Sequence, residues 1–260
     1  MLFISLLVNA SLLCLIILAL HKKKKRKKLG ASASSQNYYR PEPSCQIGEL
    51  ADLYTIFLGE RDKGLVVEVG AYDGISWSNS SCLIERGWNA ILIEPVPQYA
   101  QLCKQRYKDN SNVVIEESAI GETEGYVDIN VAQALSTTSS KMLDSYQQLE
   151  WSKNHVGHSS SVKVKRKTLD TLLEERNVSK LDVLIVDVEG AESEVFSGFS
   201  IQRWKPSIMI VELGQTHPDL HAHCESDTLI QRNIANAGYQ VIYKDKINTV
   251  FATLSTPTNL

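Results

Sequence analysis

Residues 64–79, GLVVEVGAYDGISWSN, combine an apolar run with a glycine turn, an arrangement typical of the start of a nucleotide-binding fold. A dinucleotide fingerprint, G-x-G-x-x-G, fails when it is counted from Gly70, because Tyr72 and an isoleucine replace its second and third glycines. Glu68 and Asp73 also place two carboxylates beside the turn, where they would repel a pyrophosphate. The loop therefore predicts a ligand without phosphate.

S-adenosylmethionine fits this description, since it carries a sulfonium, an ammonium, a carboxylate and a ribose diol. Acids near the loop would then attract the ligand's positive charges. Gly70 and Gly74 allow the tight turn and a close approach of the backbone to the ligand. About 20 residues further on, Glu94 ends the run NAILIEP and can accept hydrogen bonds from both ribose hydroxyls. The residues predicted to bind this cofactor are Glu68, Gly70, Ala71, Tyr72, Asp73, Gly74, Glu94, Pro95, Asp187 and, beside the adenine, Glu117, Ser118 and Ala119.

A second group of acids follows two later apolar runs. Asp187 and Glu189 come at the end of LDVLIVDVEG, and Glu212 ends IMIVE. An alcohol acceptor must lose a proton when it is methylated, so a nearby base would help. The predicted catalytic residues are Asp187, Glu189, Glu212 and His217, with His155 and His158 as further candidate bases. The carboxylates of Asp187, Glu189 and Glu192, which follow one apolar run, could instead hold a divalent cation, but no further ligand is evident in the sequence and no metal is predicted.

Strand-like and helix-like segments alternate from residue 46 onward. Near-continuous Val/Ile/Leu runs indicate strands buried on both faces of a mostly parallel sheet, and the alternation predicts a doubly wound α/β domain. The last two runs are separated by a few residues and are expected to pair antiparallel, as in methyltransferases that use S-adenosylmethionine. Strands are expected in 64–70, 89–95, 112–121, 126–131, 161–169, 181–190, 206–214, 238–245 and 247–254, and helices in 46–60, 96–108, 168–177, 191–198 and 226–237. The polar segment 134–161, with Trp151, is expected to cover the acceptor site.

Several of these motifs, taken in order, resemble one known family. EVGAYDG, LIEP, AIGETEG, LDTLL, DVLIVDVEGAESEVFSGF and PSIMIVEL look like the FkbM family of S-adenosylmethionine-dependent methyltransferases, over roughly residues 47–255. The resemblance implies a Rossmann-like class I methyltransferase sheet and methyl transfer, usually to a hydroxyl oxygen. Bacterial members more often have Asn where Tyr72 stands, and GAYDGxxxSN with Trp88 looks more like an animal branch that includes membrane-anchored proteins similar to Star.

The amino-terminal residues predict a membrane anchor. Residues 2–20 are almost wholly apolar and uncharged, and as a helix they would span ~28 Å, close to the thickness of a bilayer core. The basic run Lys22–Lys28 follows directly, which favours a single-pass protein with its main domain facing the cytoplasm and a contact with anionic lipid. The expected parts are an N-terminal transmembrane helix (1–20), a basic flank and flexible linker (21–45) and a methyltransferase domain (46–260).

The overall composition sets limits on function. The 260 residues are 43% hydrophobic and 22% charged with a net charge of −3, which suits one globular domain and gives no general affinity for nucleic acid. The five cysteines are scattered without metal-site spacing. The sequence thus predicts a membrane-tethered methyltransferase acting on an unknown hydroxyl-bearing acceptor. Its main alternative is a Star-like trafficking or adaptor protein that keeps the fold without catalysis, and a nicotinamide oxidoreductase is disfavoured by Tyr72.

Overall fold

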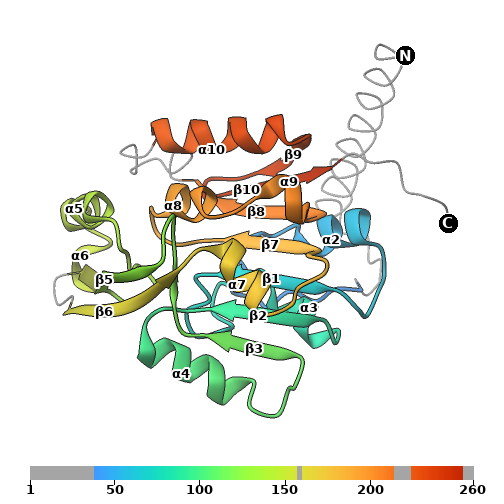
Figure 1. Ribbon diagram of the computed structural model, residues 1–260, viewed down its shortest axis with the longest axis horizontal. Coiled ribbons are helices and arrows are strands. Elements are labelled where there is room, and N and C mark those ends of the chain that lie inside the picture. Colours follow the sequence, from blue (N-terminus) through green and yellow to red (C-terminus); the bar gives the residue numbers. More distant parts are fainter. Residues whose placement is uncertain (1–37, 157–159, 214–223, 254–260) are drawn as a thin grey trace, which may run out of the picture.

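The computed structural model describes residues 38–156, 160–213 and 224–253 of the chain. Its main feature is a seven-stranded sheet with the order β3-β2-β1-β7-β8-β10-β9 (Figure 1). The strands are β1 (Leu65–Val69), β2 (Asn89–Ile93), β3 (Val113–Glu116), β7 (Val183–Val186), β8 (Ile208–Glu212), β9 (Tyr239–Lys244) and β10 (Asn248–Thr253).

The pairing of these strands confirms the predicted doubly wound sheet. β1 pairs in parallel with both β2 and β7, β2 with β3, and β7 with β8. The final strand, β10, lies between β8 and β9 and is antiparallel to both, as predicted from the short connection before it. The strand order reverses between β1 and β7, and ligands of open α/β sheets bind at such a reversal, beyond the carboxyl ends of the strands.

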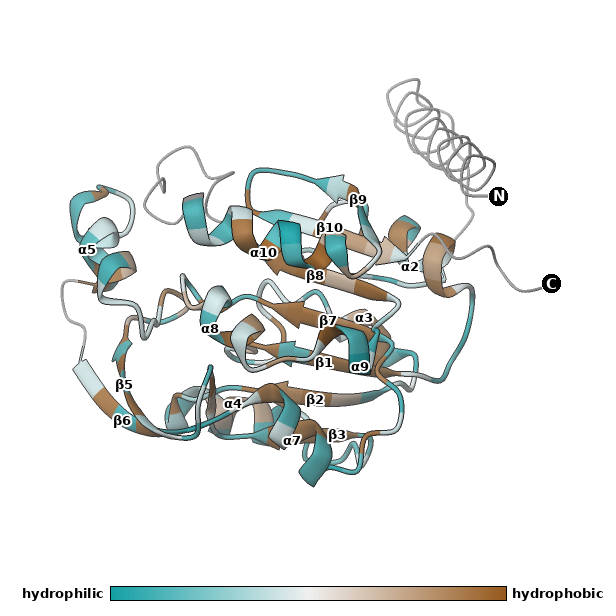
Figure 2. Cartoon of the chain, turned by 45° about the horizontal axis from the view of Figure 1, so that its top comes forward, coloured by the Kyte–Doolittle hydropathy of each residue, from teal (hydrophilic) through white to brown (hydrophobic). Residues whose placement is uncertain are grey.

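Helices cover both faces of the sheet, and among the residues that the structure describes the strands between them are strongly hydrophobic (Figure 2). One face packs mainly against α2 and α3, and the other against α7, α8, α9 and α10. Because the strands are buried on both sides, their sequences are continuously apolar rather than alternating. The helices are α2 (Leu50–Leu58), α3 (Ser81–Glu85), α4 (Pro97–Arg106), α7 (Leu169–Glu175), α8 (Glu192–Ser197), α9 (Ile201–Trp204) and α10 (Cys224–Asn236).

A smaller layer lies beyond the carboxyl ends of the main strands (Figure 1). It contains a three-stranded sheet of β4 (Ala119–Ile120), β6 (Ser160–Lys167) and β5 (Gly125–Val131), in that order. The predicted strand 112–121 is therefore two strands, β3 and β4, which belong to different sheets. Between β5 and β6 the chain forms α5 (Ser140–Gln148) and α6 (Lys153–Val156). We refer to residues 132–156 as the inserted segment.

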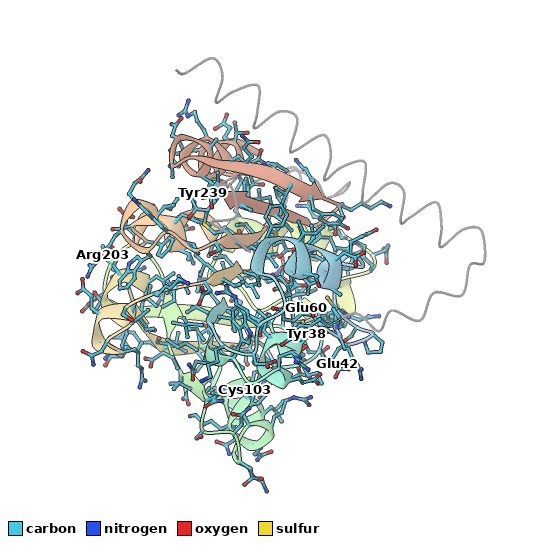
Figure 3. All side chains as sticks on the ribbon, turned by 90° about the vertical axis from the view of Figure 1, so that its right-hand side faces the viewer. Tyr38, Glu42, Glu60, Cys103, Arg203 and Tyr239 are labelled. Atoms are coloured by element: carbon cyan, nitrogen blue, oxygen red, sulfur yellow. The ribbon has the colours of Figure 1, made fainter. Side chains whose placement is uncertain are left out.

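The described chain begins by packing onto the domain. Tyr39 is fully buried, its ring lies 5.7 Å from that of Tyr54 on α2, and its hydroxyl donates a hydrogen bond to the carbonyl of Gly59 at 2.8 Å. Figure 3 views this side of the molecule, with Tyr38 and Glu42 on the same side as Glu60 in the α2–β1 loop. Residues 38–49 thus form part of the cover over one face of the sheet.

The predicted transmembrane helix is corrected here. No helix in 38–156, 160–213 or 224–253 is long and apolar enough to cross a membrane. The longest helix of these ranges, α10, has 13 residues and includes three charged side chains, whereas a span needs about 20 apolar residues. Residues 2–20 and Lys22–Lys28, on which the prediction rested, lie outside the described residues. Because the predicted transmembrane helix is not supported, the expectation of a single-pass membrane protein with a cytoplasm-facing domain is withdrawn as well.

Candidate active site

A cavity of about 700 Å³ opens at the carboxyl ends of β1, β2, β7 and β8. Its size lies within the range of small-molecule sites, and its position is the strand-order reversal of the main sheet. Eleven of the residues predicted to bind the cofactor or to catalyse line it, besides the candidate base His155: Glu68, Gly70, Ala71, Tyr72, Glu94, Pro95, Ser118, Ala119, Asp187, Glu189 and Glu212. Residues from distant parts of the sequence therefore meet in one space.

The glycine turn after β1 passes unusually close to β7. Gly70 has φ +90°, and a Cβ atom at this position would lie 1.7 Å from the carbonyl oxygen of Asp187. The N–H groups of Gly70 and Ala71 both donate to the carbonyl of Ile93, at 2.9 and 3.1 Å. Glycine is thus required here by both the close approach and the left-handed backbone. The next turn residue, Tyr72, has φ +48° and is held by a hydrogen bond from the Cys103 thiol to its carbonyl.

Glu94 lies at the end of β2 with only 5% of its surface exposed. One carboxylate oxygen accepts the N–H of Tyr72 at 2.9 Å, and the other accepts the N–H of Val96 at 2.8 Å. Each oxygen keeps a further lone pair, so the carboxylate can still accept hydrogen bonds from two hydroxyl groups. Burial raises the pKa of Glu94 to about 8, although the hydrogen bonds from these two backbone N–H groups act to lower it.

Glu68 also lines the cavity, but its oxygens are bound by the chain that follows the glycine turn. They accept hydrogen bonds from the hydroxyls of Ser78 and Ser80, at 3.1 and 2.6 Å, and from the N–H of Asn79 at 3.2 Å. Burial raises the pKa of Glu68 to about 7, which these hydrogen bonds oppose. Glu68 therefore fixes the loop 78–80 at the edge of the cavity.

Three residues predicted to bind the cofactor do not line the cavity: Asp73, Gly74 and Glu117. Asp73 closes its own turn by accepting hydrogen bonds from the N–H groups of Ile75 and Ser76, at 2.9 and 2.7 Å. Although burial acts in the opposite direction, the hydrogen bonds lower the pKa of Asp73. Gly74 packs against α4, where an added Cβ would lie 3.0 Å from the ring of Tyr107. Glu117 points away and pairs with Lys104 at 2.5 Å.

Three acids at the carboxyl ends of β7 and β8 form a cluster in the same cavity. Oxygens of Asp187, Glu189 and Glu212 lie within 4.8 Å of one another, a spacing that could also hold a cation. No histidine or cysteine of the described residues joins them. Burial and the charge of Asp187 raise the pKa of Glu189 and of Glu212 well above the ordinary value. These two carboxyl groups therefore accept and hold protons more readily than a solvated acid does.

Gln46 holds Asp187 from the amino-terminal side of the cavity. Its side-chain amide donates to Asp187 Oδ2 at 3.1 Å and accepts from the amide of Asn79 at 3.3 Å. Asn79 in turn binds Glu68 through its backbone, so one chain of contacts joins the ends of β1 and β7. Gln46 could not be found from the sequence, because a lone glutamine ahead of a helix belongs to no spacing pattern.

The turn that carries Glu189 is held by its own helix and by the inserted segment. Glu192 accepts hydrogen bonds from the N–H groups of Val188 and Gly190, at 3.1 and 3.2 Å, and so closes the start of α8. From the inserted segment, the Thr137 hydroxyl donates to the Glu189 carbonyl at 2.7 Å and the Tyr146 hydroxyl donates to the Glu189 carboxylate.

The inserted segment lines the cavity, and its predicted role as the cover of an acceptor site stays a prediction. The cavity walls include residues 133–136, Tyr146, Trp151 and His155. Of the candidate bases, His155 binds Gln133 at 2.9 Å, whereas His158 and His217 lie outside the described residues. Lining residues that the sequence did not single out include Ser76, Trp77, Ser78, Ile120, Ile129, Thr138, Ile185, Val188, Ala191, Lys246 and Ile247.

Comparison with known proteins identifies the family. Residues 68–241 match the family model for the methyltransferase FkbM domain. The chain belongs to the FkbM methyltransferase family. This assignment confirms the predicted cofactor, S-adenosylmethionine. The match to FkbM proteins is to the family as a whole and does not single out the animal, Star-like branch. Gln46, Lys246 and Ile247 line the cavity from outside the matched residues.

Solved structures of other methyltransferases have a similar fold. An FkbM methyltransferase from Methylobacillus flagellatus KT is 15% identical with a TM-score of 0.47, over 74% of this chain and 44% of that one. The present FkbM chain thus spans less than half the length of that protein. An O-methyltransferase from Bacillus cereus, in complex with SAH, is 13% identical with a TM-score of 0.42, over 94% and 91% of the two chains. The comparison with curated proteins gave no match.

Proposed function

We propose that this protein is an O-methyltransferase that transfers the methyl group of S-adenosylmethionine to a hydroxyl group of its acceptor. The observation that carries the proposal is the shared cavity. It joins the turn Gly70–Tyr72 and Glu94, which suit a nucleoside, to an acid cluster that suits proton transfer. One space thus contains the groups needed to bind the cofactor and to accept a proton.

The residues of the first half fit the cofactor. Glu94 has a lone pair left on each oxygen for the two ribose hydroxyls, and Gly70 lets the backbone approach closely. Five carboxylates line the cavity, those of Glu68, Glu94, Asp187, Glu189 and Glu212. In their ionised forms these acids favour a ligand with positive charges. When bound, the cofactor supplies a methyl group on a sulfonium, which becomes a neutral thioether as the carbon–sulfur bond breaks.

The residues of the second half suit an alcohol acceptor. A carboxylate of Glu189 or Glu212 accepts the hydroxyl proton while the acceptor oxygen forms its bond to the methyl carbon. The raised pKa of both groups makes them stronger bases than a solvated glutamate once they are ionised. The inserted segment covers this half of the cavity and limits the access of water, which would compete as an acceptor. Close alignment of the reacting groups supplies much of the rate.

The proposal is tested with methyl-labelled S-adenosylmethionine, the full chain and a panel of hydroxyl-bearing sugars, lipids and small alcohols. We expect label in an alkali-stable ether, and roughly a hundredfold slower transfer by Glu189→Gln or Glu212→Gln, since a general base contributes about this much. Glu194→Gln, at an exposed position on α8, is the matched control and should transfer at the normal rate.

Two outcomes would contradict the proposal. Label released by mild alkali would indicate methyl transfer to a carboxylate rather than a hydroxyl. Cofactor binding without transfer to any compound of the panel would favour the alternative of a non-catalytic protein on this fold.

A further inference from the structure

Tyr146 reaches the acid cluster from the inserted segment. It lies on α5, its side chain is 1% exposed, and its hydroxyl donates a hydrogen bond to Glu189 Oε2. The ring of Trp151 packs edge-on against the Tyr146 ring with centroids 5.9 Å apart, which fixes its position. Burial and the charge of Glu189 raise the pKa of Tyr146, so its hydroxyl stays protonated and acts as the donor.

Two further side chains of the inserted segment meet the same turn. The Thr137 hydroxyl binds the Glu189 carbonyl at 2.7 Å, and a Cβ atom at Gly190 would lie 2.8 Å from Met142 Cε. Glu189 itself has φ +56°, a left-handed conformation that a glutamate adopts only when its surroundings hold it. The inserted segment therefore fixes both the backbone and the carboxylate of Glu189.

Several charged groups around Glu189 influence whether its carboxyl group is protonated, and so does its hydrogen bond from Tyr146. Asp187 and Glu212 lie beside it in the cluster, and Glu192 follows on its own turn. Lys246 contributes to the same cavity from the β9–β10 turn. The neighbouring carboxylates and burial favour the protonated form of Glu189, whereas a hydrogen bond donated to the carboxylate favours the ionised form.

We infer that Tyr146 is a positioning residue for cofactor recognition, which holds the Glu189 carboxylate against the cavity through a donated hydrogen bond that favours its ionised form. This inference rests on the proposed function and deepens it. An ionised Glu189 attracts the sulfonium of S-adenosylmethionine but gains little from the neutral thioether of S-adenosylhomocysteine, because only the first carries a charge at sulfur. Tyr146 therefore contributes to the preference for the methyl donor over the spent product.

The test is a calorimetric double-mutant cycle on the full chain, with each of the two ligands as a probe. We expect Tyr146→Phe to weaken S-adenosylmethionine binding roughly three- to tenfold and S-adenosylhomocysteine binding less than about twofold. In a Glu189→Gln background the same change should have no further effect. The phenylalanine keeps the ring packing, and Tyr126→Phe, at a site 68% exposed, is the matched control.

An equal loss for both ligands, or a Tyr146→Phe effect that persists without Glu189, would overturn the inference. Failure of the unmodified chain to bind either ligand would overturn the proposed function instead. A second measurement then tests the contact independently, by ¹⁹F NMR of the chain labelled with 3-fluorotyrosine. The resonance lost in Tyr146→Phe should move in Glu189→Gln, whereas an unmoved resonance would contradict the contact.

Discussion

The two halves of the cavity are held in place by different means. In the half formed by β1 and β2, Glu94 is fixed by backbone N–H groups of Tyr72 and Val96, and the turn at Gly70 is fixed by the Ile93 carbonyl. In the half formed by β7 and β8, Asp187 and Glu189 are fixed by side chains, those of Gln46 and Tyr146. The first half is thus part of the sheet, and the second depends on segments added to it.

The two kinds of support, by backbone groups and by side chains, suit different parts of the site's work. A site made by backbone contacts at the strand ends is rigid, because moving it would disrupt the sheet itself. A site held by side chains of Gln46 and of the inserted segment can change with those segments while the sheet stays the same. We therefore expect recognition of the cofactor's ribose to be a property of the fold, whereas the added segments tune the acids near its sulfur and the choice of acceptor.

The largest effect should come from Gly70→Ala, because Gly70 lies where the two halves meet. The added Cβ would overlap the Asp187 carbonyl, so we expect a loss of about 3 kcal/mol or more in the free energy of unfolding and no cofactor binding. Gly238→Ala is a matched control, since Gly238 has nearly the same φ, +95°, with no atom within 4 Å of the added Cβ. It should cost only about 1–2 kcal/mol. Urea unfolding curves that show equal losses would contradict the close approach.

The buried carboxyl groups predict a stability that falls as pH rises. Glu68 and Glu94 have an ordinary pKa of 4.5 and folded values of about 7 and 8. Between pH 5 and 8 the folded chain therefore binds more protons than the unfolded chain, and the free energy of unfolding should decrease, on the order of 6 kcal/mol in total. Glu94→Gln should flatten this dependence and the surface change Glu117→Gln should not, as measured by thermal unfolding at each pH. A stability that rises over this range would contradict the burial of these acids.

Gln46→Ala tests the side-chain support of the acid half. Asp187 loses the amide that holds it, so we expect S-adenosylmethionine to bind roughly two- to fivefold more weakly, with little change in stability. Gln101→Ala, at an exposed position of α4, is the matched control for calorimetry. An unchanged affinity would show that Asp187 keeps its position without Gln46.

The smallest effect is expected for Glu117→Gln. The sequence places Glu117 beside the adenine, but in the structure it lies outside the cavity and pairs with Lys104. We therefore expect the affinity for S-adenosylmethionine to change by less than about twofold, since a surface ion pair contributes little. A larger loss of affinity would indicate that Glu117 contacts the cofactor after all.

The same division explains what the sequence could predict. Continuous apolar strands, the turn at Gly70 and the acid at Glu94 follow from local patterns, and the sheet and the first half of the cavity agree with them. Asp73 was misplaced by the same reasoning, because a carboxylate next to a glycine turn can either face a ligand or close its own turn, and spacing does not separate the two.

The second half depends on contacts between distant segments. Gln46 meets Asp187 across 141 positions, and Tyr146 meets Glu189 across 43. Neither residue belongs to a spacing pattern, and neither is unusual for its own segment, so only the folded arrangement reveals them. The helices α5 and α6 were missed for another reason, since the segment is polar overall and was interpreted as a loop, although Met142 and Tyr146 recur one turn apart on α5.

The central claim is that the turn at Gly70 and the carboxylate of Glu94 bind S-adenosylmethionine. It is tested most directly by calorimetric titration of this cofactor into the full chain and into Glu94→Ala, with folding of both checked by circular dichroism. We expect binding by the unmodified chain that weakens about ten- to a hundredfold in Glu94→Ala, because both ribose contacts are lost. No binding by the folded chain, or an affinity that Glu94→Ala leaves unchanged, would contradict the claim.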